Sequence, residues 1–297
     1  MKERIRELAE QKNAVILAHN YQPPEIQDIS DLVGDSLELS IKAAETKAEV
    51  IVFCGVHFMA ESASILSPDK QVLLPVTDAG CPMADMIDPE SLEKRKKELG
   101  DIPVITYVNS SAAVKAASDI CCTSANVTGV VESVPGDEIL MTPDRNLARY
   151  AARFTDKKIH LWEGFCPYHD TLSRQDVLLS KKKHPGAVFM AHPECTPEVI
   201  DMADAVKSTS GMIKYAGESR ADEFIVGTET GLLYPLSKAY PDKRFFPASE
   251  KMFCTDMKKI SLANLRGCLE NLSGEVKVPE DVRKKAYKAV KRMVDLA

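Results

Sequence analysis

Three cysteines recur along the chain at nearly regular intervals. Cys166 lies 85 residues after Cys81, and Cys254 lies 88 residues after Cys166. Each follows a short apolar run and precedes a stretch that can open a helix. Thiolates are ligands for zinc and for iron–sulfur clusters, so three of them from separate segments suit either kind of site. We therefore predict three copies of one structural unit, each delivering one thiolate to a common point.

The spacing alone leaves three interpretations of these thiols open. Zinc takes four protein ligands, or three and a water, whereas a 4Fe–4S cluster held by three cysteines leaves one iron without a protein ligand. Such an iron can act as a Lewis acid on substrate oxygens. The third interpretation is three ordinary core thiols. We favour the cluster, and the remaining cysteines lack the repeat position: Cys54, Cys121, Cys122, Cys195 and Cys268.

Polar side chains at predicted strand ends supply acid–base and hydrogen-bonding groups. They are His19 and Tyr21 in the first unit, Tyr107 and Asn109 in the second, and His192 and Glu194 in the third. Such groups transfer protons in enzymes when their surroundings adjust their pKa values. We expect a raised pKa for Glu194, suited to a general base. Among the other histidines, His169 is the best candidate for a supporting group, because it follows Cys166 by three residues.

A hydroxyl residue follows each strand end at the same distance. The separation is 17 residues in every unit: His19 to Ser36, Tyr107 to Ser124, and His192 to Thr209. Each hydroxyl belongs to a dipeptide just before a predicted helix, where it can be an ordinary N-cap. Three of them converging would instead bind carboxylate or phosphate, as helix N-termini do. The pattern therefore predicts a polyanionic substrate.

The elements that position these residues form a threefold repeat. The apolar segments that the repeat aligns are 13–22, 49–56 and 72–76, then 102–111, 138–143 and 158–165, then 186–196, 223–229 and 243–249. Strands alternating with helices predict an α/β fold with parallel sheets, whose ligands bind at the carboxyl ends of the strands. We predict three homologous three-layer αβα domains around a pseudo-threefold axis. The predicted boundaries are 1–83, 84–168 and 169–255, followed by C-terminal helices over 256–297 that pack on the repeats.

Two segments between these strands have the apolar spacing of helices. In residues 23–36, Ile26, Ile29, Leu32 and Val33 recur at helical intervals. Residues 196–208 show a similar distribution of apolar and polar residues. Each segment is therefore predicted to be one continuous helical stretch.

Composition excludes several classes of protein. The 297 residues are 44% hydrophobic and 28% charged, and the net charge is −6. A nucleic acid or an anionic membrane surface would favour a basic patch, so neither is an expected partner. No apolar run approaches the roughly 18 residues of a membrane span, and the N-terminus has the pattern of an amphipathic helix rather than a signal peptide. We expect a cytoplasmic protein without a disulfide framework.

Several long motifs resemble those of the quinolinate synthase family. They are HNYQPPEIQDISDLVGDSLELS, YVNSSAAVKAASDICCTSAN, WEGFCPYHD and AHPEC, in this order, and the resemblance covers about residues 13–268. It implies three homologous α/β domains with a central 4Fe–4S cluster held by Cys81, Cys166 and Cys254. It also implies condensation of iminoaspartate with dihydroxyacetone phosphate to quinolinate for NAD biosynthesis, with loss of phosphate and water. An enzyme that oxidises L-aspartate would supply the imine.

The resemblance also implies roles for individual residues. The catalytic set would be Tyr21, Glu194, His19 and Tyr107, with Tyr21 and Glu194 transferring protons. The residues that contact the dicarboxylate or the phosphate would be His19, Ser36, Tyr107, Asn109, Ser124, His192, Glu194 and Thr209. Some relatives carry a CxxCxxC near the third ligand, but here TDMK follows Cys254. No disulfide switch is therefore expected at that position.

Two other functions use the same features. A cluster-dependent hydro-lyase for a small hydroxy acid would use the open iron but no phosphate ester. A cluster-based redox sensor would need no acid–base groups at the strand ends. The sensor is disfavoured because the chain has no DNA-binding element or basic face, and the Tyr, His and Glu residues would be left without a task.

Overall fold

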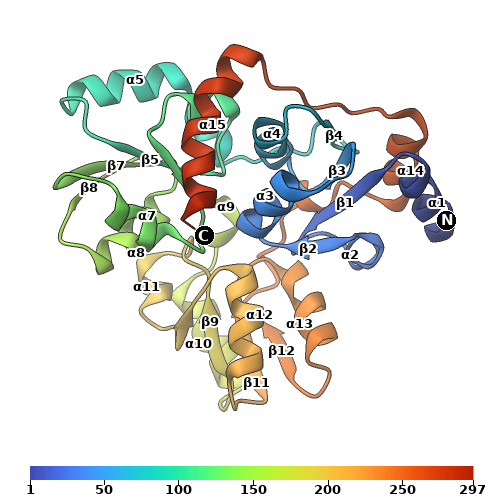
Figure 1. Cartoon of the computed structure of the whole chain (residues 1–297). Coiled ribbons are helices and arrows are strands. Elements are labelled where there is room, and N and C mark those ends of the chain that lie inside the picture. Colours follow the sequence, from blue (N-terminus) through green and yellow to red (C-terminus); the bar gives the residue numbers. More distant parts are fainter. Residues whose placement is uncertain (297) are drawn as a thin grey trace.

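Three parallel sheets meet around one centre in the computed structural model, which describes residues 1–296 (Figure 1). Each sheet has four strands, and their spatial order is second, first, third and fourth in all three. Helices flank every sheet, so the predicted α/β class with three parallel αβα units is confirmed. The boundaries at 83/84, 168/169 and 255/256 stay a prediction. Among the described residues, no helix is both long enough and apolar enough to cross a membrane.

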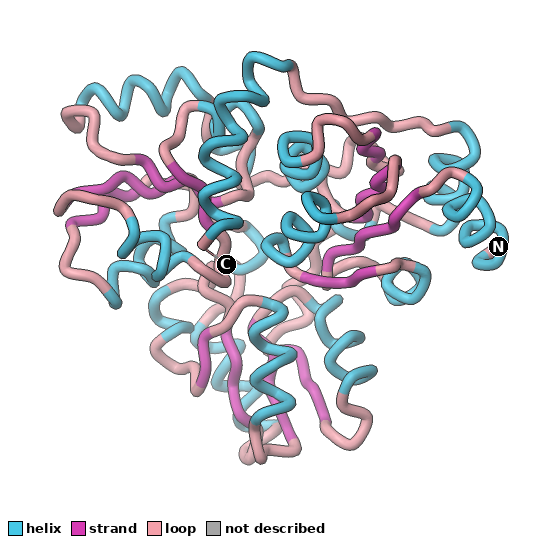
Figure 2. The backbone as a smooth tube through the Cα atoms, in the orientation of Figure 1, coloured by secondary structure: helices cyan, strands magenta, loops and turns pink. Residues whose placement is uncertain are grey.

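The strands are short and mostly buried, and they run toward the middle of the molecule (Figure 2). The first sheet contains β2 (Leu32–Gly34), β1 (Ala14–His19), β3 (Val50–Cys54) and β4 (Gln71–Leu73). The second contains β6 (Ile120–Cys122), β5 (Val104–Tyr107), β7 (Glu138–Thr142) and β8 (Lys158–Leu161). The third contains β10 (Ala205–Val206), β9 (Val188–Ala191), β11 (Glu223–Gly227) and β12 (Arg244–Pro247).

The helices follow the same threefold order. The first unit has α1 (Lys2–Gln11), α2 (Pro24–Ile29), α3 (Ser36–Glu45), α4 (His57–Leu66) and the short turn η1 (Ala84–Met86). Next come α5 (Pro89–Glu98), α6 (Ala112–Ala116), α7 (Val127–Ser133), α8 (Arg145–Ala151), η2 (Ala152–Phe154) and α9 (Pro167–Asp170). The third set is α10 (Arg174–Lys183), α11 (Pro197–Ile200), α12 (Thr209–Glu218), η3 (Thr230–Leu232), α13 (Leu233–Ala239) and η4 (Asp256–Lys258). The chain ends with α14 (Leu262–Asn271) and α15 (Glu280–Asp295).

The strands β2, β6 and β10 were not predicted, and each lies at the edge of its sheet. Strand β2 falls inside 23–36, where the helix ends at Ile29, and β10 falls inside 196–208, where the helix ends at Ile200. The prediction of one continuous helix in each segment is therefore wrong. Strands of two or three residues are too short to show a period, and pairing with the neighbouring strand decides their conformation.

One aspartate ties each of these edge strands to the first strand of its unit. The carboxylate accepts a hydrogen bond of 2.8 Å from a backbone N–H 15 residues earlier in all three units: Asp31 from Ile16, Asp119 from Val104, and Asp204 from Phe189. The bond gives a partner to a backbone N–H of the first strand of each unit, which would otherwise be buried without one. Its threefold recurrence shows that the units repeat in detail as well as in outline.

A lysine just before the fourth strand of each sheet caps the C-terminus of a helix. Its ammonium donates to the carbonyl of the C-cap residue: Lys70 to Thr46 of α3, Lys157 to Val134 of α7, and Lys243 to Ser219 of α12. A cation at a helix C-terminus is favourable because it meets unpaired carbonyls and the negative end of the helix dipole. The opposite ends of these same helices face the centre of the molecule, where the predicted hydroxyl residues lie.

The C-terminal segment joins the first two units. Helix α15 packs against α4 of the first unit and α6 of the second (Figure 1), and Asn126 donates 3.1 Å to the carbonyl of Met293 near its end. Before α15, Glu275 forms an antiparallel bridge with Leu73 at the edge of β4. Gly274 has φ +79°, and a side chain there would collide with the carbonyl of Leu74, so only glycine fits this turn.

Candidate active site

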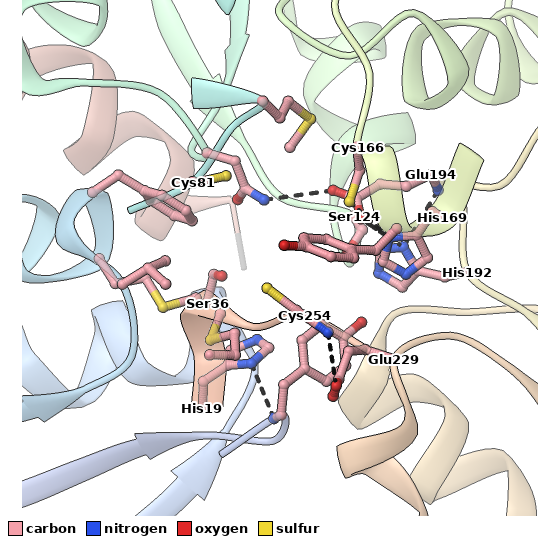
Figure 3. Close-up of a pocket in the computed structure, with 18 of the residues that line it drawn as sticks. His19, Ser36, Cys81, Ser124, Cys166, His169, His192, Glu194, Glu229 and Cys254 are labelled. Atoms are coloured by element: carbon pink, nitrogen blue, oxygen red, sulfur yellow. Dashed lines mark hydrogen bonds and ion pairs between the residues drawn. The ribbon is translucent and has the colours of Figure 1, made fainter. Parts of the chain in front are cut away.

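The carboxyl ends of the three sheets border one central cavity, shown in Figure 3. It contains about 740 Å³ of empty space, including its opening to solvent. Every site residue predicted from the sequence lines it: His19, Tyr21, Ser36, Cys81, Tyr107, Asn109, Ser124, Cys166, His192, Glu194, Thr209 and Cys254.

Three thiols face this cavity from three equivalent turns (Figure 3). Cys166 is the N-cap residue of α9, and Cys81 and Cys254 lie just before η1 and η4. Burial raises the pKa of Cys81 to about 12 and that of Cys254 to about 11. Burial also raises the pKa of Cys166 well above its ordinary value. Backbone N–H groups of the following turn oppose the rise at each sulfur, so all three thiols are placed to bind a metal with release of a proton.

The separation of the thiols argues against a single zinc ion. Among the described residues, the set of three potential ligands whose donor atoms all lie within 4.8 Å is Cys166, His169 and Glu194. The three thiols do not form such a set, so at least two of their sulfurs are farther apart than that. Sulfurs bound to one tetrahedral zinc ion lie about 3.8 Å apart. The three thiols therefore surround a space wider than one ion fills.

Two buried histidines have the same hydrogen bonding in the first and third units. Nδ1 of His19 accepts from the backbone N–H of Tyr21 at 3.2 Å, and Nδ1 of His192 accepts from that of Glu194 at 3.3 Å. Burial lowers the pKa of both imidazoles to about 3. A neutral ring that accepts at Nδ1 carries its proton on Nε2. Both histidines therefore offer one N–H donor.

The carboxylate of Glu194 is buried, yet it is ionised. Burial by itself raises its pKa, but His169, whose Nδ1 lies 2.7 Å away, outweighs this, and a hydrogen bond from Tyr107 adds to the effect. The net result is a pKa of about 2. The raised pKa predicted from the sequence is therefore wrong, because the neighbouring imidazole is a closer and stronger influence than burial.

A continuous chain of contacts joins Tyr21 to Glu194. The hydroxyl of Tyr21 lies 2.5 Å from Oγ1 of Thr228, which lies 2.8 Å from Nε2 of His169. Nδ1 of the same imidazole reaches Glu194 and lies 3.2 Å from the sulfur of Cys166. Burial raises the pKa of Tyr21 well above its ordinary value, so its phenol stays protonated.

Sequence reasoning missed two residues of this region, Thr228 and Glu229. Both directly follow β11, and Glu229 lines the cavity. The signal was present, because polar residues at the carboxyl end of a parallel strand point to a site. The prediction used this signal only for the first strand of each unit, whereas Thr228 and Glu229 follow β11, the third strand of its unit.

The hydroxyl residues occupy two different settings. Ser36 and Thr209 are the first residues of α3 and α12, whose N-cap side chains bond each other, since Ser208 donates to Asp35 at 3.1 Å. Ser124 instead lies in the turn ahead of α7, which begins at Val127. The N-termini of α3 and α12 are thus joined at the cavity wall. The carboxylate of Asp35 already accepts the N–H groups of Leu37 and Glu38, so the hydroxyls of Ser36 and Thr209 are the groups that face the cavity and can contact an anion.

A second hollow lies next to the central cavity, with which it shares Asp35 and Ser124. Residues of α3, α7 and α12 line it, so it lies beside the same joined helix ends. Lys207 and Lys214 also face it. The carboxyl side chains of Asp35 and Glu38 line the hollow as well, so groups of both charges border it.

Three parallel α/β units that direct thiols, acid–base groups and helix N-termini into one cavity define an α/β enzyme with its site at the junction of the repeats. The family model of the quinolinate synthetase A protein matches residues 3–295. Three relatives have high identity along nearly their whole length. Quinolinate synthase of Geobacter sp. (strain M21) is 55% identical over 99% of this chain and 97% of the relative. Quinolinate synthase 1 of Methanosarcina acetivorans is 56% identical over 98% of this chain and 96% of the relative. Quinolinate synthase 2 of the same organism is 53% identical over 99% of this chain and 95% of the relative. The chain belongs to the quinolinate synthase family.

The lowered pKa values of His19 and His192 can be tested by nuclear magnetic resonance on metal-free protein labelled with ¹⁵N-histidine. Because the folded-state pKa lies below the ordinary value, both rings should stay neutral, with the proton on Nε2, from pH 8 down to pH 5. Their nitrogen shifts should not change over that range. His19→Asn and His192→Asn assign the signals, and a titration midpoint near 6.5 for either ring would contradict its burial as a neutral imidazole.

Proposed function

We propose that this protein is a quinolinate synthase that condenses iminoaspartate with dihydroxyacetone phosphate, releasing phosphate and water. The observation that carries the proposal is the convergence of three thiols, two helix N-termini and the Tyr21–Glu194 chain on one cavity. Relatives named quinolinate synthase match almost the entire chain and support it. An enzyme that oxidises L-aspartate would supply the unstable imine. A cytoplasmic location, without nucleic-acid or membrane partners, agrees with the negative charge and the free cysteines.

We propose that Cys81, Cys166 and Cys254 hold a 4Fe–4S cluster. Three sulfurs around a space wider than one zinc ion support a group of several metal atoms. Backbone N–H groups directed at each sulfur favour the thiolate that such a group needs. When bound by three cysteines, the cluster supplies one iron without a protein ligand, which is a Lewis acid.

Substrate anions would be held by donors from all three units. Ser36 and Thr209 at the helix N-termini suit a carboxylate or phosphate, and the Nε2–H groups of His19 and His192 add two neutral donors. On the second unit, Tyr107, Asn109 and Ser124 complete the wall. Oδ1 of Asn109 is buried without a partner, so a donor on the substrate would satisfy it.

Proton transfer would use the two ends of the hydrogen-bonded chain. Glu194 is ionised and can accept a proton from the condensing imine. Tyr21 is protonated and can give a proton to a leaving hydroxide. Thr228 and His169 lie between them, so a proton taken at one end can be returned toward the other. His19 and Tyr107 flank the reacting groups as hydrogen-bond donors.

The proposal is tested by anaerobic purification, metal analysis and assay. We expect about four iron and four sulfide per chain, and quinolinate formed only when iminoaspartate and dihydroxyacetone phosphate are both present. A colourless protein with one zinc would overturn the cluster. Turnover of a small hydroxy acid, with no need for the phosphate ester, would instead support the hydro-lyase.

Replacing any of the three proposed ligands should abolish the cluster. In Cys81→Ala, Cys166→Ala and Cys254→Ala, two thiolates remain, which is too few to complete three ligated irons. Iron content and the visible absorption of the purified protein measure the loss. Cys268→Ala is the matched control, because that thiol lies in α14 and does not line the cavity. A ligand variant with full iron and activity would remove that cysteine from the site.

Replacing the carboxylate of Glu194 should separate chemistry from cluster binding. Glu194→Gln keeps the shape and removes the base, so kcat should fall by about 10²–10⁴-fold with iron content unchanged. Glu198→Gln is the control, since Glu198 is exposed on α11 only four residues away. Turnover of Glu194→Gln at the normal rate would refute the role of Glu194 as a base.

A further inference from the structure

Glu229 and Lys258 form an ion pair beside the cavity that the proposed chemistry leaves without a role. The Lys258 ammonium lies 2.9 Å from Oε2 of Glu229, and the carboxylate side chain is only 1% exposed. Removing such a pair from water is costly, and apolar residues of the same size often replace one without loss of stability. Its presence at this position therefore calls for a function other than stability.

The carboxylate of Glu229 holds the backbone of the third thiol. Oε1 accepts the backbone N–H of Cys254 at 3.2 Å, while Oε2 accepts that of Gly231 at 2.8 Å. The neighbouring Phe253 is 47% exposed, so this part of the loop lies at the surface, between the buried side chains of Met252 and Met257. A hydrogen bond to a buried carboxylate is one of the stronger ways to fix such a loop.

The ammonium of Lys258 extends the link to the first unit. It also donates to the backbone carbonyl of Tyr21. A Cβ on Gly231 would come within 2.7 Å of Lys258 Nζ, Glu229 Oε2 and the Tyr21 carbonyl, so these groups close around a position without a side chain. Nearby, Gln22 donates 2.7 Å to the carbonyl of Met257. The turn after Cys254 is thus tied to the segment that carries Tyr21.

The two charges of the pair compensate each other next to the turn that carries Cys254. The carboxylate of Glu229 is 1% exposed and lies 2.9 Å from the Lys258 ammonium. Without Lys258 it would be a buried negative charge with no partner. With Lys258 in place, Glu229 can accept the backbone N–H groups of Cys254 and Gly231 as part of a neutral pair.

We propose that Glu229 and Lys258 are positioning residues that hold Cys254 toward the other two thiols and fix its turn to the Tyr21 segment. The inference rests on the proposed cluster. It assigns the carboxylate to the geometry of one ligand and the ammonium to charge balance and attachment. Replacing either Glu229 or Lys258 should make the protein lose the iron of the cluster faster.

The test is the rate at which the anaerobically purified holoprotein loses iron to a chelator, followed by visible absorption. Lys258→Met leaves a buried anion beside the thiolates and should speed the loss about tenfold or more. Glu229→Gln should also speed it, and Lys258→Arg should restore most of the retention. In the double variant Glu229→Gln/Lys258→Met, no buried charge is left without a partner. The rate of iron loss should therefore increase by less than the product of the increases in the two single variants.

Lys251→Met is the matched control, because it breaks an exposed ion pair with Asp176 only three residues before Cys254. Gly231→Ala keeps both charges and crowds the pair, so it should act in the same direction even if Lys258→Met fails to fold. The electron paramagnetic resonance signal of the reduced cluster should shift in Lys258→Met and in Gly231→Ala. A merely structural role would not require such a shift. Iron loss and signals equal to wild type would overturn the inference. A wild-type protein without a cluster would overturn the proposed function, and this inference with it.

Discussion

The whole site depends on one geometric constraint: the strands of all three parallel sheets end at the same point. Because ligands of parallel sheets lie beyond the strand ends, each unit contributes the last residues of its strands and the turns and helix starts next to them. No unit holds more than one of the three thiols that face the cavity. The site therefore exists only when the units are packed together, and α15, which bridges the first two units, belongs to the machinery that maintains it.

Burial acts on neighbouring groups of this cavity in different ways. It keeps His19 and His192 neutral and Tyr21 protonated, since each of those charged forms would lose hydration. Glu194 is equally buried, yet its contact with the imidazole of His169 stabilises the anion. One apolar environment thus produces donors and an acceptor side by side, and the choice at each residue is made by its nearest partner.

The repeat and the central site could be predicted from the sequence because both appear as residue types at regular spacings. Cysteines at nearly regular intervals, and a strand end followed 17 residues later by a hydroxyl, mark equivalent positions without any knowledge of contacts. The edge strands β2, β6 and β10 left no such signal, because two or three residues form a strand only when a neighbour pairs with them. The three aspartates and three lysines that support the units were likewise invisible as isolated polar residues.

Residue types and spacing therefore determined, from the sequence alone, the α/β class, the threefold repeat and the side chains that line the cavity. Tertiary structure decided how those side chains behave. The pKa of Glu194 follows from a 2.7 Å contact with a residue 25 positions away, and Cys254 is held by Glu229, which the repeat does not mark. Charge state and orientation depend on distances of a few ångströms between segments far apart in the chain, because electrostatic interactions in a buried site are strong and local. Only the folded structure contains those distances.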